Sequence, residues 1–136
     1  MKTLSFLITL TLIAATSSLN AQQADVLDGK RYAIKAWDIT NTDLKTPDLL
    51  IFRKGMVDAP VCHEYGFFPS TYEVYEDKGK TYFEFTSESP YEGEVAFSGI
   101  YLGDRIEGTY TWRKSGREDL NYEFEGIIQD TSKKPN

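Results

Sequence analysis

The sequence predicts an all-β fold, an antiparallel up-and-down barrel of about eight strands, with a two-sheet β-sandwich as the alternative. Three observations lead to this prediction. Apolar and polar residues alternate with a period of two in most segments. Turns that contain glycine or proline separate these segments, and no window has the pattern of a long helix. A closed barrel is favoured over a sandwich because closure leaves no open sheet edge.

The N-terminal residues predict export. Residues 1–21 have the organisation of a cleaved secretory signal peptide, with a cationic start and an uncharged apolar run at residues 4–15. This run is shorter than the roughly 20 residues that a membrane-spanning helix needs. A lipid anchor is not expected, because the only cysteine, Cys62, lies far from the apolar run. We therefore expect a soluble periplasmic or extracellular protein that begins at Gln22 and has no membrane anchor.

The rest of the chain is predicted to form one domain, residues 22–130, followed by a flexible tail, residues 131–136. Removal of the signal, with one lysine and no acid, would change the formal net charge from −6 to −7. An acidic surface repels phosphate backbones, which argues against nucleic acid as a partner. A single cysteine cannot form an internal disulfide. Buried apolar area must therefore stabilise the fold.

The first two-thirds of the chain contains five segments with the pattern of a strand. They are residues 30–39, 48–53, 56–62, 72–76 and 82–86. The polar stretch 40–47 is predicted to be a loop, and Ser87-Glu88-Ser89 has the composition of a turn. Each predicted strand is short and ends at a turn, so neighbouring strands are expected to pair antiparallel.

The last third is predicted to be a three-stranded meander. Its strands are residues 93–102, 105–114 and 120–128. Each strand carries an apolar residue, a polar residue and an inward glycine in succession, as Phe97-Ser98-Gly99, Ile106-Glu107-Gly108 and Phe124-Glu125-Gly126. A glycine weakens a strand unless a bend or a close approach requires it. Three such glycines in register predict a curved wall.

Two spaced motifs give the chain a resemblance to a known family. The motif Cys62-x-x-x-Gly66-Phe67-x-x-x-x-Tyr72 is followed by Gly99-x-x-x-Gly103-Asp104-x-Ile106-x-Gly108-Thr109-x-x-Trp112. Over most of residues 48–128 the chain resembles small secreted bacterial lipocalin-like domains of unknown function. It departs from true lipocalins at Gly29-Lys30-Arg31, where their first strand usually has Gly-x-Trp. The resemblance implies a calycin-type barrel and says little about a ligand.

Aromatic side chains dominate the predicted inner face. An eight-stranded barrel is either filled by its side chains or holds one small ligand. If the rings line a cup, with tyrosine hydroxyls as its polar groups, the partner is a small, largely apolar molecule, and no cofactor is expected. The candidate ligand-binding residues are Tyr32, Phe85, Phe97, Tyr101, Tyr110, Trp112 and Phe124.

A second group of rings is predicted to lie in loops at one end of the barrel. Its members are Tyr65, Phe67, Phe68 and Tyr91. Gly66 and Pro69 favour a loop at this point in the chain. The loop either covers the open end of the core or exposes its rings to a partner, because exposed aromatic clusters mark interaction sites. A protein–protein interaction or inhibitor module is therefore the alternative function.

The only cysteine and the only histidine are adjacent, at Cys62 and His63. Neighbours in a strand point to opposite faces, so a Cys–His catalytic pair is not expected if the strand continues to residue 62. Together with Glu64 they also lack the spacing of a metal site. We therefore predict a non-enzymatic protein with no catalytic residue and no metal ligand. Cys62 is expected to be a buried apolar residue or, alternatively, to form a disulfide between molecules.

Overall fold

The computed structural model describes residues 25–129, so the predicted signal peptide and the predicted tail lie outside the described residues. Eight strands and one 3-10 helix make up the fold. They are β1 (Arg31–Asp38), β2 (Asn41–Arg53), β3 (Met56–Asp58), the 3-10 helix η1 (Pro60–Tyr65), β4 (Ser70–Asp77), β5 (Lys80–Ser89), β6 (Gly93–Tyr101), β7 (Arg105–Arg113) and β8 (Leu120–Ile128). Within the described range, no helix has the length and apolar character needed to cross a membrane.

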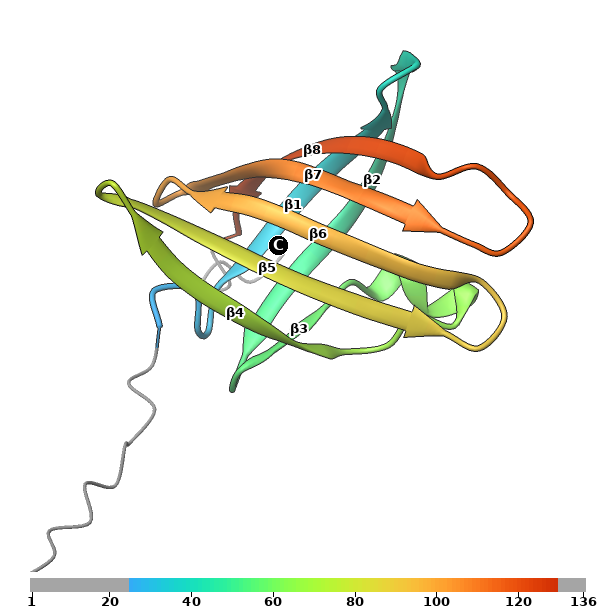
Figure 1. The fold of residues 1–136 in the computed structure, drawn as a ribbon. Helices are drawn as coiled ribbons and strands as arrows, with labels where there is room; N and C mark the ends of the chain where they lie inside the picture. Colours follow the sequence, from blue (N-terminus) through green and yellow to red (C-terminus); the bar gives the residue numbers. More distant parts are fainter. Residues whose placement is uncertain (1–24, 130–136) are drawn as a thin grey trace, which may run out of the picture.

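The strands form a closed up-and-down barrel (Figure 1). Each strand pairs antiparallel with the next, and β8 pairs with β1. This confirms the predicted barrel and excludes the sandwich. The pairing is extensive everywhere except around the short β3, which pairs with β4 only through Met56 opposite Thr71 and Val57 opposite Ser70.

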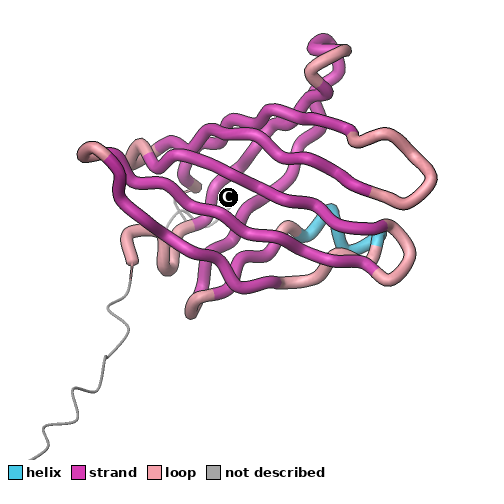
Figure 2. The backbone as a smooth tube through the Cα atoms, in the orientation of Figure 1, coloured by secondary structure: helices cyan, strands magenta, loops and turns pink. Residues whose placement is uncertain are grey.

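The barrel has two unlike ends. The end that we call the Leu27 end contains the N-terminal turn, residues 25–30, and the turns that follow β2, β4 and β6. The opposite end, which we call the η1 end, contains η1 and the turns that follow β1, β5 and β7. Figure 2 shows the helical segment in cyan at the η1 end. The rest of the described chain consists of strands and loops.

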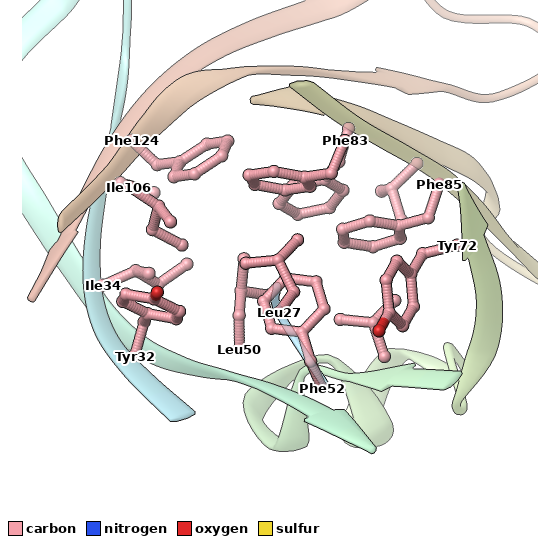
Figure 3. Close-up of a cluster of buried hydrophobic side chains, with 14 of the residues drawn as sticks. Leu27, Tyr32, Ile34, Leu50, Phe52, Tyr72, Phe83, Phe85, Ile106 and Phe124 are labelled. Carbon is pink, nitrogen blue, oxygen red and sulfur yellow. The ribbon is translucent and has the colours of Figure 1, made fainter. Parts of the chain in front are cut away.

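Leu27 closes its end of the barrel. The Asp25 carboxylate accepts hydrogen bonds from the backbone N–H groups of Leu27 and Asp28, at 2.8 and 3.0 Å, and so fixes the turn. The Leu27 side chain is fully buried and lies among inward-facing rings such as Phe52 and Phe83 (Figure 3). Leu27 therefore fills the core at this end.

Glycines on the inner face make room for rings. A Cβ atom on Gly99 would lie 2.3 Å from the Phe83 ring, and one on Gly108 would lie 2.1 Å from a backbone oxygen of Ser98. Gly99 and Gly108 face each other across β6 and β7, as predicted. Gly126 lies opposite Ile106 and not opposite Gly108, which pairs with Phe124. The prediction of three glycines in register is therefore wrong for Gly126.

Three predicted boundaries are wrong. Residues 41–47 belong to β2 and not to a loop, because their polar composition reflects a hairpin whose side chains are all exposed. The strand at Met56 ends at Asp58 and not at residue 62, since Pro60 begins η1. Ser87-Glu88-Ser89 is not a turn but the end of β5, where it pairs with β6. Serine and polar residues were misleading here because they occur in turns and in paired strands alike.

Candidate functional site

Four inward rings form a stacked ladder across β5 to β8. Phe85, Phe97, Tyr110 and Tyr122 lie directly opposite one another in successive strands. Their ring centroids are 4.4, 4.5 and 4.6 Å apart, with interplanar angles of 11, 21 and 12°. The two phenylalanines are buried, whereas the two tyrosines are half-buried. The ladder therefore runs from the closed core toward solvent.

Other candidate ligand-binding residues lie in two places. Tyr32 and Phe124 are fully buried, and the Tyr32 hydroxyl donates to the carbonyl of Gly103 at 2.8 Å near the Leu27 end. Burial raises the Tyr32 pKa above its ordinary value, with Tyr101 as a nearby second cause. Phe124 packs on Phe97 at 5.6 Å and so adjoins the ladder. The candidate ligand-binding residues therefore belong to, or pack against, one continuous hydrophobic core. They do not all line one cavity.

Phe67 covers the barrel at the η1 end. Its side chain is only 4% exposed and packs edge-on against Trp112, with ring centroids 6.3 Å apart. Of the two alternatives for this loop, Phe67 follows the first, because its ring turns toward the core and covers it. It therefore does not belong to the exposed rim for which it was a candidate. A cavity of about 10 Å³ lies beneath it, lined among others by Cys62 and Phe97. This volume is at the lower limit of the space that one water molecule needs.

Two buried serines hold the segment that carries Phe67. Ser87 and Ser89 are the buried polar residues of the described range. The Ser87 hydroxyl donates to the Phe68 carbonyl at 3.0 Å, and the Ser89 hydroxyl donates to the Tyr65 carbonyl at 2.8 Å. Ser89 also accepts hydrogen bonds from the N–H groups of residues 91 and 92, at 3.3 and 3.2 Å. One hydroxyl therefore joins η1 to the β5–β6 turn.

A glycine lets the chain approach these serines. Gly66 follows η1 with a φ angle of 82°, in the left-handed region that favours glycine. A Cβ atom at this position would lie 2.7 Å from the Ser89 hydroxyl oxygen. Any side chain at residue 66 would therefore displace the hydroxyl that fixes the segment.

Three rings at the η1 end remain exposed. The exposed fractions are 46% for Tyr65, 61% for Phe68 and 83% for Tyr91. Tyr65 keeps one edge against Trp112, with centroids 5.9 Å apart. We call these three residues the aromatic rim. They come from the two segments that Ser87 and Ser89 tie together, so the backbone that carries the rim is fixed.

Asp48 and Cys62 form a polar contact on the inner side of η1. Asp48 lies opposite the buried Ile34, so it faces the interior. Its carboxylate accepts hydrogen bonds from the N–H groups of Leu49 and Val61, at 2.7 and 3.1 Å. The Cys62 thiol lies 3.6 Å from the other carboxylate oxygen. Asp48 was not predicted as a site residue, although it has the same parity along β2 as the inward Leu50 and Phe52.

The electrostatics of this contact favour neutral groups. Burial raises the pKa of the Asp48 carboxyl above its ordinary value. Burial, and secondarily the Asp48 charge, raises the pKa of the Cys62 thiol to about 12. A thiol with such a pKa is almost entirely protonated at neutral pH and is a weak nucleophile. The half-buried Cys62 therefore behaves as a small core residue more than as a reactive group.

His63 does not pair with Cys62. Its Nε2 atom lies 2.6 Å from a carboxylate oxygen of Asp58, and its ring lies against Phe68 with centroids 5.4 Å apart. The expected separation by a sheet is wrong, because both residues are in η1 and not in a strand. Each has its own carboxylate partner instead. In the described part of the chain, no three His, Cys, Asp or Glu side chains are grouped so that they could hold a metal ion.

Comparisons with models of protein families, with curated proteins and with solved structures find no match to this chain. The closed eight-stranded barrel agrees with the architecture that the lipocalin-like resemblance implies. Any statement about function therefore depends on the geometry of the molecule itself.

Proposed function

We propose that the protein is an exported, non-enzymatic binding module, lipocalin-like in family, that contacts a protein partner through the aromatic rim of Tyr65, Phe68 and Tyr91. One observation carries the proposal: these rings are exposed at the end of a barrel whose interior is filled by other rings. Large exposed apolar groups that cluster on a soluble protein mark interaction surfaces. Aromatic residues are also enriched in the buried centres of protein interfaces.

The rim is suited to binding because its backbone is already ordered. The serine hydroxyls and the left-handed Gly66 fix the two segments, so little conformational entropy would be lost on association. The exposed carboxylates of Glu64 and Glu88 come from the same segments. The Arg117 guanidinium lies over the Trp112 ring that packs against Tyr65, so a cation borders the rim as well. The partner surface that fits is therefore an apolar patch with charges of both signs beside it.

The test is a matched comparison of two triple variants. In the rim variant, Tyr65, Phe68 and Tyr91 are changed to alanine. In the control variant, alanine replaces three exposed apolar residues that lie away from the rim, Val26, Leu102 and Ile127. Proteins from the exported fraction of the native cell are cross-linked to each variant and identified, and their affinities are measured with purified components. We expect the rim variant to lose at least about tenfold in affinity, the effect of one or two interface hot spots, and the control to keep its affinity. Equal capture by both variants would refute the proposal.

A second candidate function is the binding of a small apolar ligand within the barrel. The observation that favours it is the solvent-facing end of the ring ladder, where Tyr110, Tyr122 and the neighbouring Trp112 are only half-buried. A ligand there would extend the stack and displace Phe67. Native mass spectrometry of protein isolated from its own compartment tests this candidate. An adduct that is lost in Tyr110→Ala, but kept in Thr109→Ala on the outer face, supports it, and the bare polypeptide mass argues against it.

A further inference from the structure

One sheet edge in the barrel wall lacks a partner strand over most of its length. β4 has eight residues, but β3 pairs with only its first two, Ser70 and Thr71. The Tyr72 N–H then donates to the Gly55 carbonyl at 3.4 Å. From Glu73 to Asp77, within the described residues, β4 pairs only with β5. Figure 1 shows β4 continuing past the start of β3 toward the β4–β5 turn.

The strand geometry identifies the free groups. The N–H and C=O of one strand residue point to the same side, and this side alternates along the strand. Because the Tyr72 N–H points toward β3, the N–H and C=O groups of Val74 and Glu76 also point to the open side. Within the five-residue stretch Glu73 to Asp77, Val74 and Glu76 thus carry the unpaired groups. An exposed edge of this kind is a template for pairing with another strand.

A groove lies along this edge. Its volume is about 870 Å³, within the range of known binding pockets, and its lining includes Asp25, Asp28, Lys54, Val74 and Tyr75. The Asp25 carboxylate is held in place by the Tyr72 hydroxyl at 2.8 Å. The half-buried Val74 faces the core side of the strand, and the exposed Tyr75 faces the outer side. A strand added here would find an apolar face and a polar face.

We propose that the free edge of β4 binds an extended basic segment of a partner protein by strand addition. The charge of the groove selects this occupant. The groove lining contains the acids Asp25, Asp28 and Glu73, and Lys54 is its only cation. Two further acids, Glu76 and Asp77, continue β4 beyond the lining. A second copy of the chain would bring the acids of one β4 against those of another, and like charges opposite each other destabilise a sheet. The edge is remote from the aromatic rim, so this inference does not rest on the proposed function.

The register of the added strand predicts its composition. A residue opposite Val74 exchanges backbone hydrogen bonds with it and points to the same, inner face. The neighbouring residues point outward, beside Glu73 and Tyr75. The preferred segment therefore alternates apolar residues with lysine or arginine, and a suitable probe is the blocked peptide Lys-Val-Lys-Val-Lys-Val-Lys.

The test separates strand addition from simple charge attraction. The probe is titrated against the protein, and the same peptide with N-methylated valines serves as a control of equal charge. Two variants of the protein are compared: Glu76→Pro removes the free N–H and the carboxylate, whereas Glu76→Gln removes only the carboxylate. Proline is tolerated on the open side of an edge strand, and the melting temperature of each variant confirms that it folds.

We expect the N-methylated peptide to bind at least about tenfold more weakly than the probe, and Glu76→Pro to bind the probe about tenfold more weakly than Glu76→Gln. Equal affinities in both comparisons would overturn the proposal in favour of non-specific charge attraction. Sedimentation of the protein alone is the second readout. A dimer that Glu76→Pro dissociates would also overturn it, because the edge would then belong to a second copy of the chain.

Discussion

The two ends of the barrel use the same inward rows of side chains differently. Along β2 the inward residues change from Phe52 and Leu50 to Asp48, and along β5 they change from Phe83 and Phe85 to Ser87 and Ser89. Toward the Leu27 end the rows contain fully buried apolar groups such as Phe52 and Phe83. At the η1 end they finish in polar groups that bind the backbone of a covering segment. One end therefore supplies stability, and the other fixes a loop that presents rings to solvent.

The largest effect should come from a cavity at the Leu27 end. Phe52 is fully buried and contacts three rings edge-on or nearly so, among them Tyr72 and Phe83 at 5.0 and 5.4 Å. We expect Phe52→Ala to lower the free energy of unfolding by about 3–5 kcal/mol, measured by urea denaturation. Phe68→Ala, at the exposed rim, should change it by less than about 0.5 kcal/mol. Similar losses for the two variants would remove the contrast between the ends.

An intermediate effect is expected at the serines of the η1 end. Ser89→Ala leaves the Tyr65 carbonyl and the N–H groups of residues 91 and 92 without their hydroxyl partner. The expected loss in the free energy of unfolding is about 1–3 kcal/mol. Amide hydrogen exchange should also accelerate at residues 91 and 92 while the strands at the Leu27 end stay protected. Ser98→Ala on the exposed outer face is the control, and equal exchange in both variants would show that Ser89 does not fix the turn.

The strands were predictable because one physical rule produces them. A wall that separates core from solvent requires alternation, and the alternation in β6, β7 and β8 is regular enough to place their ends within about two residues. The rule says nothing about pairing where both faces are exposed, which is why residues 41–47 were assigned to a loop. It also cannot distinguish a strand from a 3-10 helix over a few residues, as at Cys62.

The candidate site was less predictable because its key groups have ordinary sequence signals. The rings of Tyr65, Phe68 and Tyr91 were found from residue type alone, but the burial of Phe67 depends on how η1 ends at Gly66. Ser87 and Ser89 were dismissed for their composition. Extending the parity of Phe83 and Phe85 by two more positions would have placed both hydroxyls inside the barrel, opposite Val95 and Gly93.

The smallest effect is expected on the melting temperature when Asp48 is replaced. It tests whether the ionised Asp48 carboxylate lowers the stability of the folded protein. Burial raises its folded-state pKa above the ordinary value of 3.8, so folding favours the protonated carboxyl. This contribution to stability is fully present below about pH 3.8 and is lost as the pH rises through the folded-state pKa. Asp48→Asn keeps an acceptor for the Leu49 and Val61 N–H groups without the charge. At pH 7 we expect the variant to melt about 2–4 °C above the native protein, with the difference shrinking toward pH 3.5.

The same substitution should also act on the thiol. The Asp48 charge contributes to the raised pKa of Cys62, so Asp48→Asn should speed alkylation of the thiol at pH 8. Asp43→Asn, in the exposed part of β2, is the matched charge control and should leave both the melting temperature and the alkylation rate unchanged. A variant Asp48→Asn that melts below the native protein at pH 7 would mean that the ionised carboxylate stabilises the η1 end. In that case both ends would stabilise the fold, the Leu27 end through buried apolar groups and the η1 end through a charged one.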